Sequence, residues 1–295
     1  MGAVEWGMLA LLAALWGGSF LFNAIAVREL PTLTIVALRV GLAATVLWTI
    51  VIVLKRPLPQ ERHIWLAFLG MGILNNVIPF CLIVWGQHAI TSGLASILNA
   101  TTPLCTVAVA GIFLRDEPMT RRKLIGLLIG FAGVIMMIGP TAMAGVARDA
   151  LAALACLGAA LSYAFASVFG RRFRRFGVDP VVVATGQVTG SFVILAPFAL
   201  MFHGVWVMPH GVTTGAILGL AVFSTALAYV LFFNILARAG ATNISLVTFL
   251  VPVFAIALGA IVLNEPIQAV QILGMGMIGM GLIAIDGRLI GRKNS

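Results

Sequence analysis

Polar side chains recur at helical spacing inside stretches that are otherwise apolar, where hydrogen-bonding groups are costly. The longest stripe repeats every three or four residues and so lies on one face of a helix, at Ser92, Ser96, Asn99, Thr102 and Thr106. One shorter stripe contains Trp16, Ser19 and Asn23, and another contains Thr242, Ser245 and Pro252, with Thr248 nearby. Hydroxyl and amide groups can bind a small polar ligand, and they also hold membrane helices together. The stripes therefore predict either a ligand path or helix packing.

Four further polar residues could contact a ligand more directly. Arg39 lies about seven residues from the outer end of its apolar segment, or ~10 Å deep by helical rise. It could hold a carboxylate, or it could snorkel or bond to backbone carbonyls. Asn75, Asn76 and Asn99 each have four hydrogen-bonding sites to satisfy, and lipid supplies none. They are expected to face a wet cavity or a partner helix.

The titratable residues do not form a catalytic or metal-binding cluster. All nine Asp and Glu residues fall in predicted loops or near helix ends, and the three cysteines fit as small apolar packing residues. We therefore expect no catalytic residue, no metal and no cofactor. An integral-membrane enzyme is the less favoured alternative, and a channel would need a continuous polar pore.

The elements that carry these side chains are long apolar helices. The composition is 61% hydrophobic and 9% charged, which is far from that of soluble domains. Stretches of about 20 apolar residues are long enough to cross a bilayer. We predict an all-α integral membrane protein with ten transmembrane helices, at 5–27, 32–54, 64–86, 92–114, 122–139, 149–170, 179–202, 212–237, 242–264 and 268–287.

The cations are distributed unequally between the predicted loops. If ten helices alternate in direction, fifteen of the 18 Lys and Arg residues fall on one side and two on the other. Cytoplasmic loops of membrane proteins are enriched in cations, so both termini are expected in the cytoplasm of a bacterial cell, inside its inner membrane. The run RRFRRF at 171–176 is then a topology anchor, and no nucleic-acid partner is expected.

An internal repeat divides the chain. The turns Glu117-Pro118 and Glu265-Pro266 are each followed by glycines 9 and 16 residues after the Glu. Polar pairs also correspond, Asn75-Asn76 with Ser224-Thr225, while Arg39 has a polar counterpart in Gln187. The repeats span 1–140 and 149–288, with a short basic cytoplasmic tail at 289–295. Because each unit has an odd number of helices, five, the second must be inverted in the membrane.

The repeat also pairs two prolines near the predicted middles of their helices. Pro103 and Pro252 each remove one helical hydrogen bond, which predicts either a paired hinge that lines a cavity or a static kink. The Glu-Pro turns are expected to be structural helix stops. The full set of candidate substrate-binding or cavity-lining residues is Trp16, Ser19, Arg39, Asn75, Asn76, Phe80, Ser96, Asn99, Tyr163, Ser224, Tyr229, Ser245 and Thr248.

These features together resemble the EamA branch of the drug/metabolite transporter superfamily, and within it the YddG-type bacterial exporters of aromatic and other amino acids. The resemblance covers nearly the whole chain and rests on the ten predicted helices, the inverted five-helix units and the two Glu-Pro turns. It implies an exporter of small amphipathic metabolites, amino acids included, that works by alternating access. Because no acid is expected at mid-membrane, obligatory ion coupling is not expected. A small molecule and membrane lipid are the expected partners, and the chain is compatible with a monomer.

Overall fold

The computed structural model describes residues 3–113, 120–143, 147–204, 209–244 and 247–286. All regular structure in these ranges is helical. In the first half the helices are α1 (Ala3–Ala26), α2 (Thr32–Val53), α3 (Arg62–Gly72), η1 (Ile73–Val77), α4 (Ile78–Gly86), α5 (Ser92–Asn99), α6 (Thr102–Phe113) and α7 (Arg121–Met143). In the second half they are α8 (Ala147–Arg175), α9 (Pro180–His203), α10 (Gly211–Leu218), η2 (Gly219–Leu227), α11 (Ala228–Ile244), α12 (Val247–Leu263) and α13 (Ala269–Asp286).

The described helices are long and apolar enough for a multi-pass membrane protein. Seven helical segments are 22 to 28 residues long with high mean hydropathy, and two shorter apolar helices cover Leu250–Leu263 and Ala269–Gly281. A helix of this length spans the hydrocarbon core. Large apolar side chains such as Ile112, Met201 and Ile261 lie on the outside of the bundle, each more than 70% exposed. In a membrane, these side chains face lipid.

Two of the long segments contain π-helical turns. The first, η1, lies between α3 and α4, and the second, η2, lies between α10 and α11. They carry the polar pairs Asn75-Asn76 and Ser224-Thr225, which the repeat makes equivalent. A π-turn widens the helix and is frequent at functional sites. Sequence periodicity did not predict these turns.

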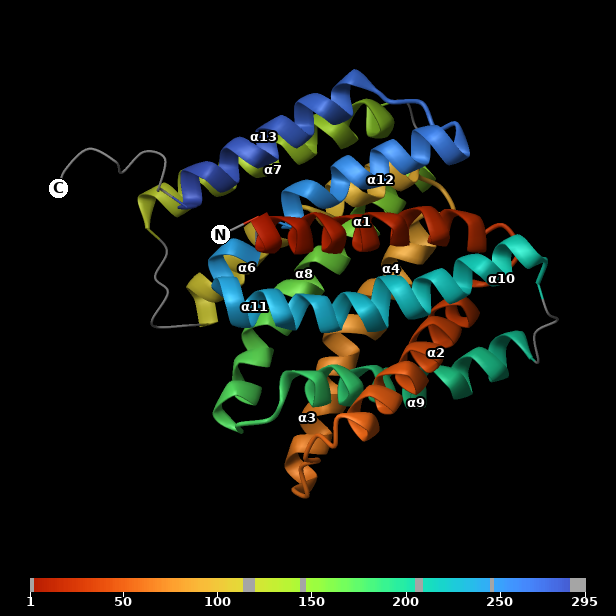
Figure 1. The fold of residues 1–295 in the computed structure, drawn as a ribbon. Helices are drawn as coiled ribbons and strands as arrows, with labels where there is room; N and C mark the ends of the chain where they lie inside the picture. The colour runs from red at the N-terminus through yellow and green to blue at the C-terminus, as the bar shows by residue number, and fades with distance from the viewer. Residues whose placement is uncertain (1–2, 114–119, 144–146, 205–208, 245–246, 287–295) are drawn as a thin grey trace.

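Glycines let α7 and α13 cross in direct backbone contact, and the two helices lie side by side along one edge of the molecule (Figure 1). A Cβ at Gly281 would lie 2.5 Å from the carbonyl oxygen of Gly126, and one at Gly133 would lie 2.9 Å from that of Gly274. The earlier glycine of each helix therefore meets the later glycine of the other, so the helices are antiparallel. These are the four glycines that follow the two Glu-Pro turns in the sequence.

The observed helix ends differ from the prediction around the eighth and ninth spans. We expected a loop between 237 and 242, but α11 continues to Ile244. The sequence Arg238-Ala239-Gly240-Ala241 contains no proline, and alanine favours helix, so nothing local stops it. The next helix, α12, begins at Val247. Glu117, Pro118 and Ser245 lie outside the described residues.

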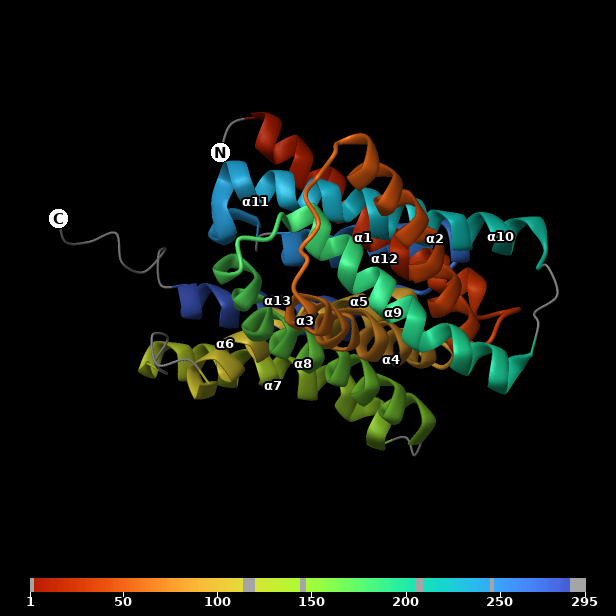
Figure 2. The ribbon, with the colours of Figure 1, turned by 90° about the horizontal axis from the view of Figure 1, so that it is seen from below.

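One end of the bundle holds the loops that the charge distribution assigns to the outside, and we call it the outer end. Contacts between the two halves occur there. The Glu265 carboxylate accepts hydrogen bonds from the Ser92 amide at 2.9 Å, the Ser92 hydroxyl at 2.7 Å and the Gly93 amide at 3.3 Å. The helices α2 and α9 pack side by side (Figure 2). At the other end of the bundle Arg56, just after α2, forms a 3.1 Å ion pair with Asp179, just before α9.

Candidate functional site

Arg39 is the centre of the candidate site. It is only 5% exposed, and its Nε–H donates to Thr225 Oγ1 at 2.9 Å. Its guanidinium carbon lies 3.7 Å from the centroid of the Phe80 ring, as in a cation–π contact. Among the described residues no carboxylate forms an ion pair with Arg39. A desolvated guanidinium with one hydroxyl partner is suited to receive an anionic group from a ligand.

Three elements position this guanidinium. Arg39 is the eighth residue of α2, and α2 packs against α9 on one side and η2 on the other. Thr225 lies in η2, and its own hydroxyl donates to the Leu220 carbonyl at 2.8 Å, a bond to the fifth residue before it that the π-turn creates. This bond orients the Thr225 oxygen to accept from Arg39. Phe80 comes from α4 of the same half as Arg39, and Thr225 comes from the second half, so the site contains residues of both halves.

A second polar cluster lies between η1, α9 and α11. The Asn75 amide donates to Gln187 Oε1 and to the Tyr229 hydroxyl oxygen, both at 3.1 Å. Tyr229 in turn donates to Asn76 Oδ1 at 2.9 Å, and the Asn76 amide donates to Ser191 Oγ at 3.0 Å. Asn76 is fully buried, which indicates that it joins helices, whereas Asn75 is half-buried.

The two clusters are related by the repeat. Arg39 of α2 binds Thr225 of η2, and Gln187 of α9 binds Asn75 of η1. Gln187 is the repeat counterpart of Arg39, and the bonded partners lie in the corresponding polar pairs. Each half therefore sends one long polar side chain to the π-turn of the other half. The arrangement is asymmetric in charge, because only the Arg39 side is cationic.

Aromatic side chains surround the polar groups. Tyr163 packs against two apolar clusters, each of which contains residues of both halves, and Tyr163 and Tyr229 lie close enough to Arg39 to interact with its charge. Trp16 of α1 lies 5.7 Å from Phe232 of α11, measured between ring centroids. Aromatic walls with a few fixed polar groups are typical of small-molecule sites. Among these residues, Trp16, Phe80, Tyr163 and Tyr229 were sequence candidates.

The serine candidates contact backbone carbonyls. Ser19 donates to Trp16 O at 2.6 Å, Ser96 to Gly93 O at 2.7 Å, and Ser224 to Leu15 O at 2.7 Å. The first two bonds stay within one helix, and the third joins η2 to α1. These contacts favour helix packing, and a substrate role for the three serines stays a prediction. Thr248 is half-buried in α12.

Asn99 behaves differently from the serines because its Oδ1 atom is buried and has no hydrogen-bond partner in the described structure. It is the last residue of α5, and the chain then leaves helical geometry at Ala100 and Thr101. An unmet buried acceptor is costly, and a ligand donor or a water would relieve it. This favours the cavity interpretation for Asn99.

The two prolines differ in their local structure. Near Pro103 the span is broken between α5 and α6, and the Thr102 hydroxyl donates to the freed Asn99 carbonyl at 2.6 Å. Near Pro252 the helix α12 is continuous. Pro252 is the sixth residue of α12 and has no amide hydrogen to donate to the Thr248 carbonyl four residues earlier. A hinge role for either proline stays a prediction.

Glu265 was expected to be a helix stop only, and the structure adds a second role. Its carboxylate caps α5 from the other half of the chain and holds three donors at the start of that helix. A second link at the outer end joins Glu29 to Thr213 at 2.7 Å and to His210 at 3.0 Å. These hydrogen bonds, that from Thr213 first, lower the pKa of Glu29 to about 2, so it is ionised at neutral pH.

Sequence reasoning identified Arg39 and the asparagines but missed three partners of theirs. Thr225 was seen only as a member of a repeated polar pair, Gln187 only as a counterpart of Arg39, and Ser191 was not considered. A usable signal existed, since each is a polar residue inside an apolar span. No group of three or more metal-ligating side chains occurs within the described ranges.

Comparisons with known proteins agree with this architecture. The model of the EamA-like transporter family matches residues 5–139 and again residues 150–285. An "Uncharacterized transporter" of Archaeoglobus fulgidus is 25% identical over 92% of this chain and 94% of its own length. A "Probable amino-acid metabolite efflux pump" of Escherichia coli is 26% identical over 91% of this chain and 90% of its own. A crystal structure with 18% identity covers 99% of this chain and 100% of its own, with a TM-score of 0.70, which indicates a shared fold.

Because the two family matches cover most of the chain, the protein belongs to the EamA-like transporter family, within the drug/metabolite transporter superfamily.

Proposed function

We propose that this transporter exports small amphipathic metabolites that carry a carboxylate, with amino acids, aromatic ones included, as the leading substrates. The observation that carries the proposal is the buried Arg39, which has no carboxylate partner in the described structure and lies beside aromatic side chains. A substrate carboxylate would supply the missing charge, and an aromatic side chain would pack on Phe80, Tyr163 or Tyr229. The proposal assigns the protein to carriers and not to enzymes.

Two features support an amphipathic substrate in particular. The polar groups of Arg39, Asn75 and Gln187 are few and fixed by hydrogen bonds, while Phe80, Tyr163 and Tyr229 belong to an otherwise mainly aliphatic surrounding cluster. Such a site favours the binding of a ligand with one charged end and one apolar end. Two relatives that match over about nine-tenths of this chain carry the name "Probable amino-acid metabolite efflux pump". Their names make amino acids the first class to test.

The proposed mechanism is alternating access between two inverted five-helix units, in a bundle of ten spans. The substrate would bind between the halves, and exchange of their packing would open one side at a time. In the present conformation the halves are joined at the outer end by Glu265 with Ser92 and by Glu29 with Thr213. Outward opening would break such contacts, so they are candidates for an outer gate.

We also propose that transport needs no ion gradient. The described acids lie at helix ends, and the buried charge at the site is cationic, so proton or sodium binding has no carboxylate to compensate it there. Purified protein in liposomes, with labelled phenylalanine or another amino acid on one side only, should give saturable flux down the substrate gradient in either direction. A proton or sodium gradient should not produce uphill accumulation.

Empty liposomes and liposomes with the Arg39→Gln protein are the controls for this assay. Flux that rises linearly with concentration, without counterflow, would favour a channel instead of a carrier. Reproducible accumulation that an ionophore abolishes would reject uncoupled transport. If no amino acid in a panel of labelled compounds is moved, the substrate class is wrong.

The proposed location is the bacterial inner membrane with both termini in the cytoplasm. A reporter fused after Arg175 should therefore report cytoplasm, and one fused after Arg148 should report the outside, because the cation-rich loops stay inside. Enzymatic reporters that are active on only one side of the membrane measure this directly. The opposite pair of results would mean that the protein has the inverse orientation in the membrane, and every contact assigned above to the outer end would then lie on the cytoplasmic side.

A further inference from the structure

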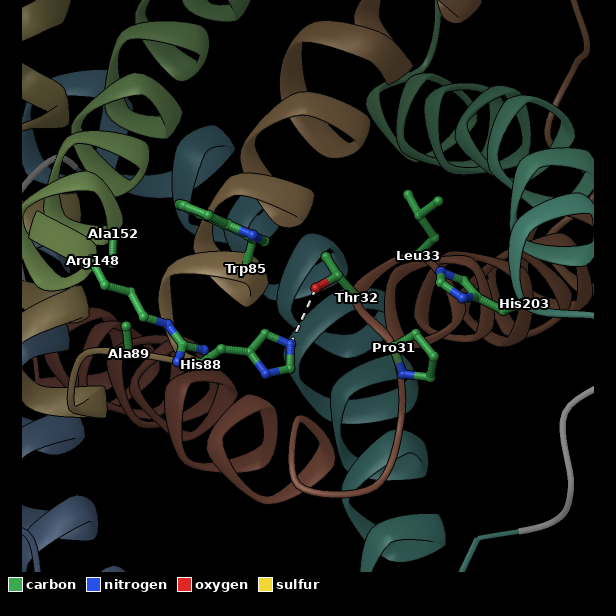
Figure 3. A pocket seen from close by; sticks show the side chains of 9 residues that line it. All are labelled: Pro31, Thr32, Leu33, Trp85, His88, Ala89, Arg148, Ala152 and His203. Atoms are coloured by element: carbon green, nitrogen blue, oxygen red, sulfur yellow. Dashed lines mark hydrogen bonds between the residues drawn. The ribbon is translucent and has the colours of Figure 1, made fainter.

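A cavity of about 400 Å³ opens at the outer end, away from Arg39 (Figure 3). It lies between the start of α2, the turn after α4, the start of α8 and the end of α9. Its lining residues are Pro31, Thr32, Leu33, Trp85, His88, Ala89, Arg148, Ala152 and His203. The transport proposal uses none of them.

The polar lining of this cavity favours an anion. Arg148 and His88 lie side by side, His203 lies across the cavity from them, and no acid is among the lining residues (Figure 3). His88 Nε2 is 3.3 Å from the Thr32 hydroxyl oxygen, which fixes the ring. Burial, and after it the charge of Arg148, lowers the pKa of His88. At neutral pH the cavity thus offers the Arg148 guanidinium and the neutral His88 imidazole, which can donate a hydrogen bond.

A second cavity of about 400 Å³ lies next to the first, and Leu33 lines both. Its lining is entirely apolar, from Leu33, Val77, Ile78, Cys81, Leu82, Ile194, Leu195 and Phe198. Ile78 is seven residues before Trp85 on the same helix, or ~10 Å deeper in the bilayer. Ile78 is 37% and Phe198 50% exposed, so the edge of this cavity faces the lipid.

We propose that the two cavities together bind one anionic phospholipid of the leaflet next to the outer end, with its phosphate at Arg148 and His88 and an acyl chain in the apolar cavity. The polar part lies at headgroup depth and the apolar part at acyl-chain depth, which matches the shape of a lipid. A free phosphate would fill only the first part. Basic pockets between transmembrane helices bind anionic headgroups on the cytoplasmic side of membranes, and this cavity presents the same kind of groups at the outer end.

The test is native mass spectrometry of the purified full-length protein in detergent, titrated with phosphatidylglycerol or with phosphatidylcholine of the same chains. We expect phosphatidylglycerol to bind preferentially. Arg148→Gln should weaken its binding roughly tenfold, the fold-change expected when a charged hydrogen bond is lost. Arg28→Gln is the matched control, because Arg28 is an exposed cation at the same end that does not line either cavity. It should bind phosphatidylglycerol as the original protein does.

A second arm separates a lipid from a free anion without a substitution in the apolar cavity. Phosphatidylglycerol with long chains should bind more tightly than its dihexanoyl form, and millimolar inorganic phosphate should not displace it. Equal binding of the two lipid classes, or an unchanged affinity in Arg148→Gln, would overturn the proposal. Displacement by inorganic phosphate, with no effect of chain length, would overturn it in favour of a small-anion site.

Discussion

Arg39→Gln is expected to lower transport of carboxylate substrates by roughly 30-fold to 1000-fold, since removing one partner of a buried charged pair costs about 2–4 kcal/mol. The loss should appear mainly as a higher KM, because the lost contact is made with the bound substrate. Glutamine is uncharged but can still hydrogen-bond Thr225, so the packing around α2 has a substitute. Initial rates in proteoliposomes, corrected for the amount of inserted protein, give the comparison.

A paired substrate separates binding from folding in this experiment. Phenylalanine and phenethylamine have the same ring, but only phenylalanine carries a carboxylate. If Arg39 binds the carboxylate, the substitution reduces transport of phenylalanine relative to that of phenethylamine. An equal reduction for both compounds would make Arg39 a structural residue, and the carboxylate proposal would fail. Arg28→Gln should transport both compounds at the original rates, since Arg28 is exposed at the outer end.

Gly281→Ala is expected to destabilise the protein because it forces α7 and α13 apart. The added Cβ would lie 2.5 Å from the Gly126 carbonyl oxygen and 2.8 Å from the Gly130 nitrogen, and both are backbone atoms that no rotamer change can move. Overpacking of this kind costs roughly 1–3 kcal/mol. Alanine is a better helix former than glycine by about 1 kcal/mol, so the clash must exceed that gain.

Gly276→Ala in the same helix is the matched control. No atom lies within 4 Å of a Cβ at that position, so only the helix-propensity gain remains there. Thermal unfolding of the two purified variants in detergent should move in opposite directions, with Gly281→Ala lower and Gly276→Ala equal or higher. If Gly281→Ala is as stable as Gly276→Ala, the close crossing of α7 and α13 is not required in solution.

The repeat shows how far a sequence pattern can lead. The equal spacing of glycines after the two Glu-Pro turns was visible in the sequence, but spacing along one helix cannot say which surface that helix meets. The structure places Gly126 against Gly281 and Gly133 against Gly274, so the repeated glycines meet where two antiparallel helices cross. The same holds for Glu265, whose three donors lie 173 and 172 residues earlier in the chain.

The sequence by itself determined that this protein lies in a lipid membrane and that its fold is helical. Apolar stretches of spanning length must satisfy their backbone hydrogen bonds internally, and a helix does this with local contacts only. The break next to Pro103 was also predictable, because a proline removes a defined hydrogen bond wherever it stands in a helix. The helix α12 is continuous through Pro252, so a hinge or a static kink there stays a prediction, and the start of α12 was not evident from the sequence.

Only the tertiary structure decided which polar residues meet. Arg39 and Thr225 are 186 residues apart, and Asn75 and Gln187 are 112 apart. The π-turns set the direction in which Thr225 and Asn75 point from the helix axis, and they have no sequence signature that we recognised. A side chain's partner depends on helix rotation and on the packing of distant segments, which long-range contacts fix. The sequence therefore predicted the membrane fold and Arg39 and Phe80 as candidates, whereas the pairing of Arg39 with Thr225 follows from how the two halves pack.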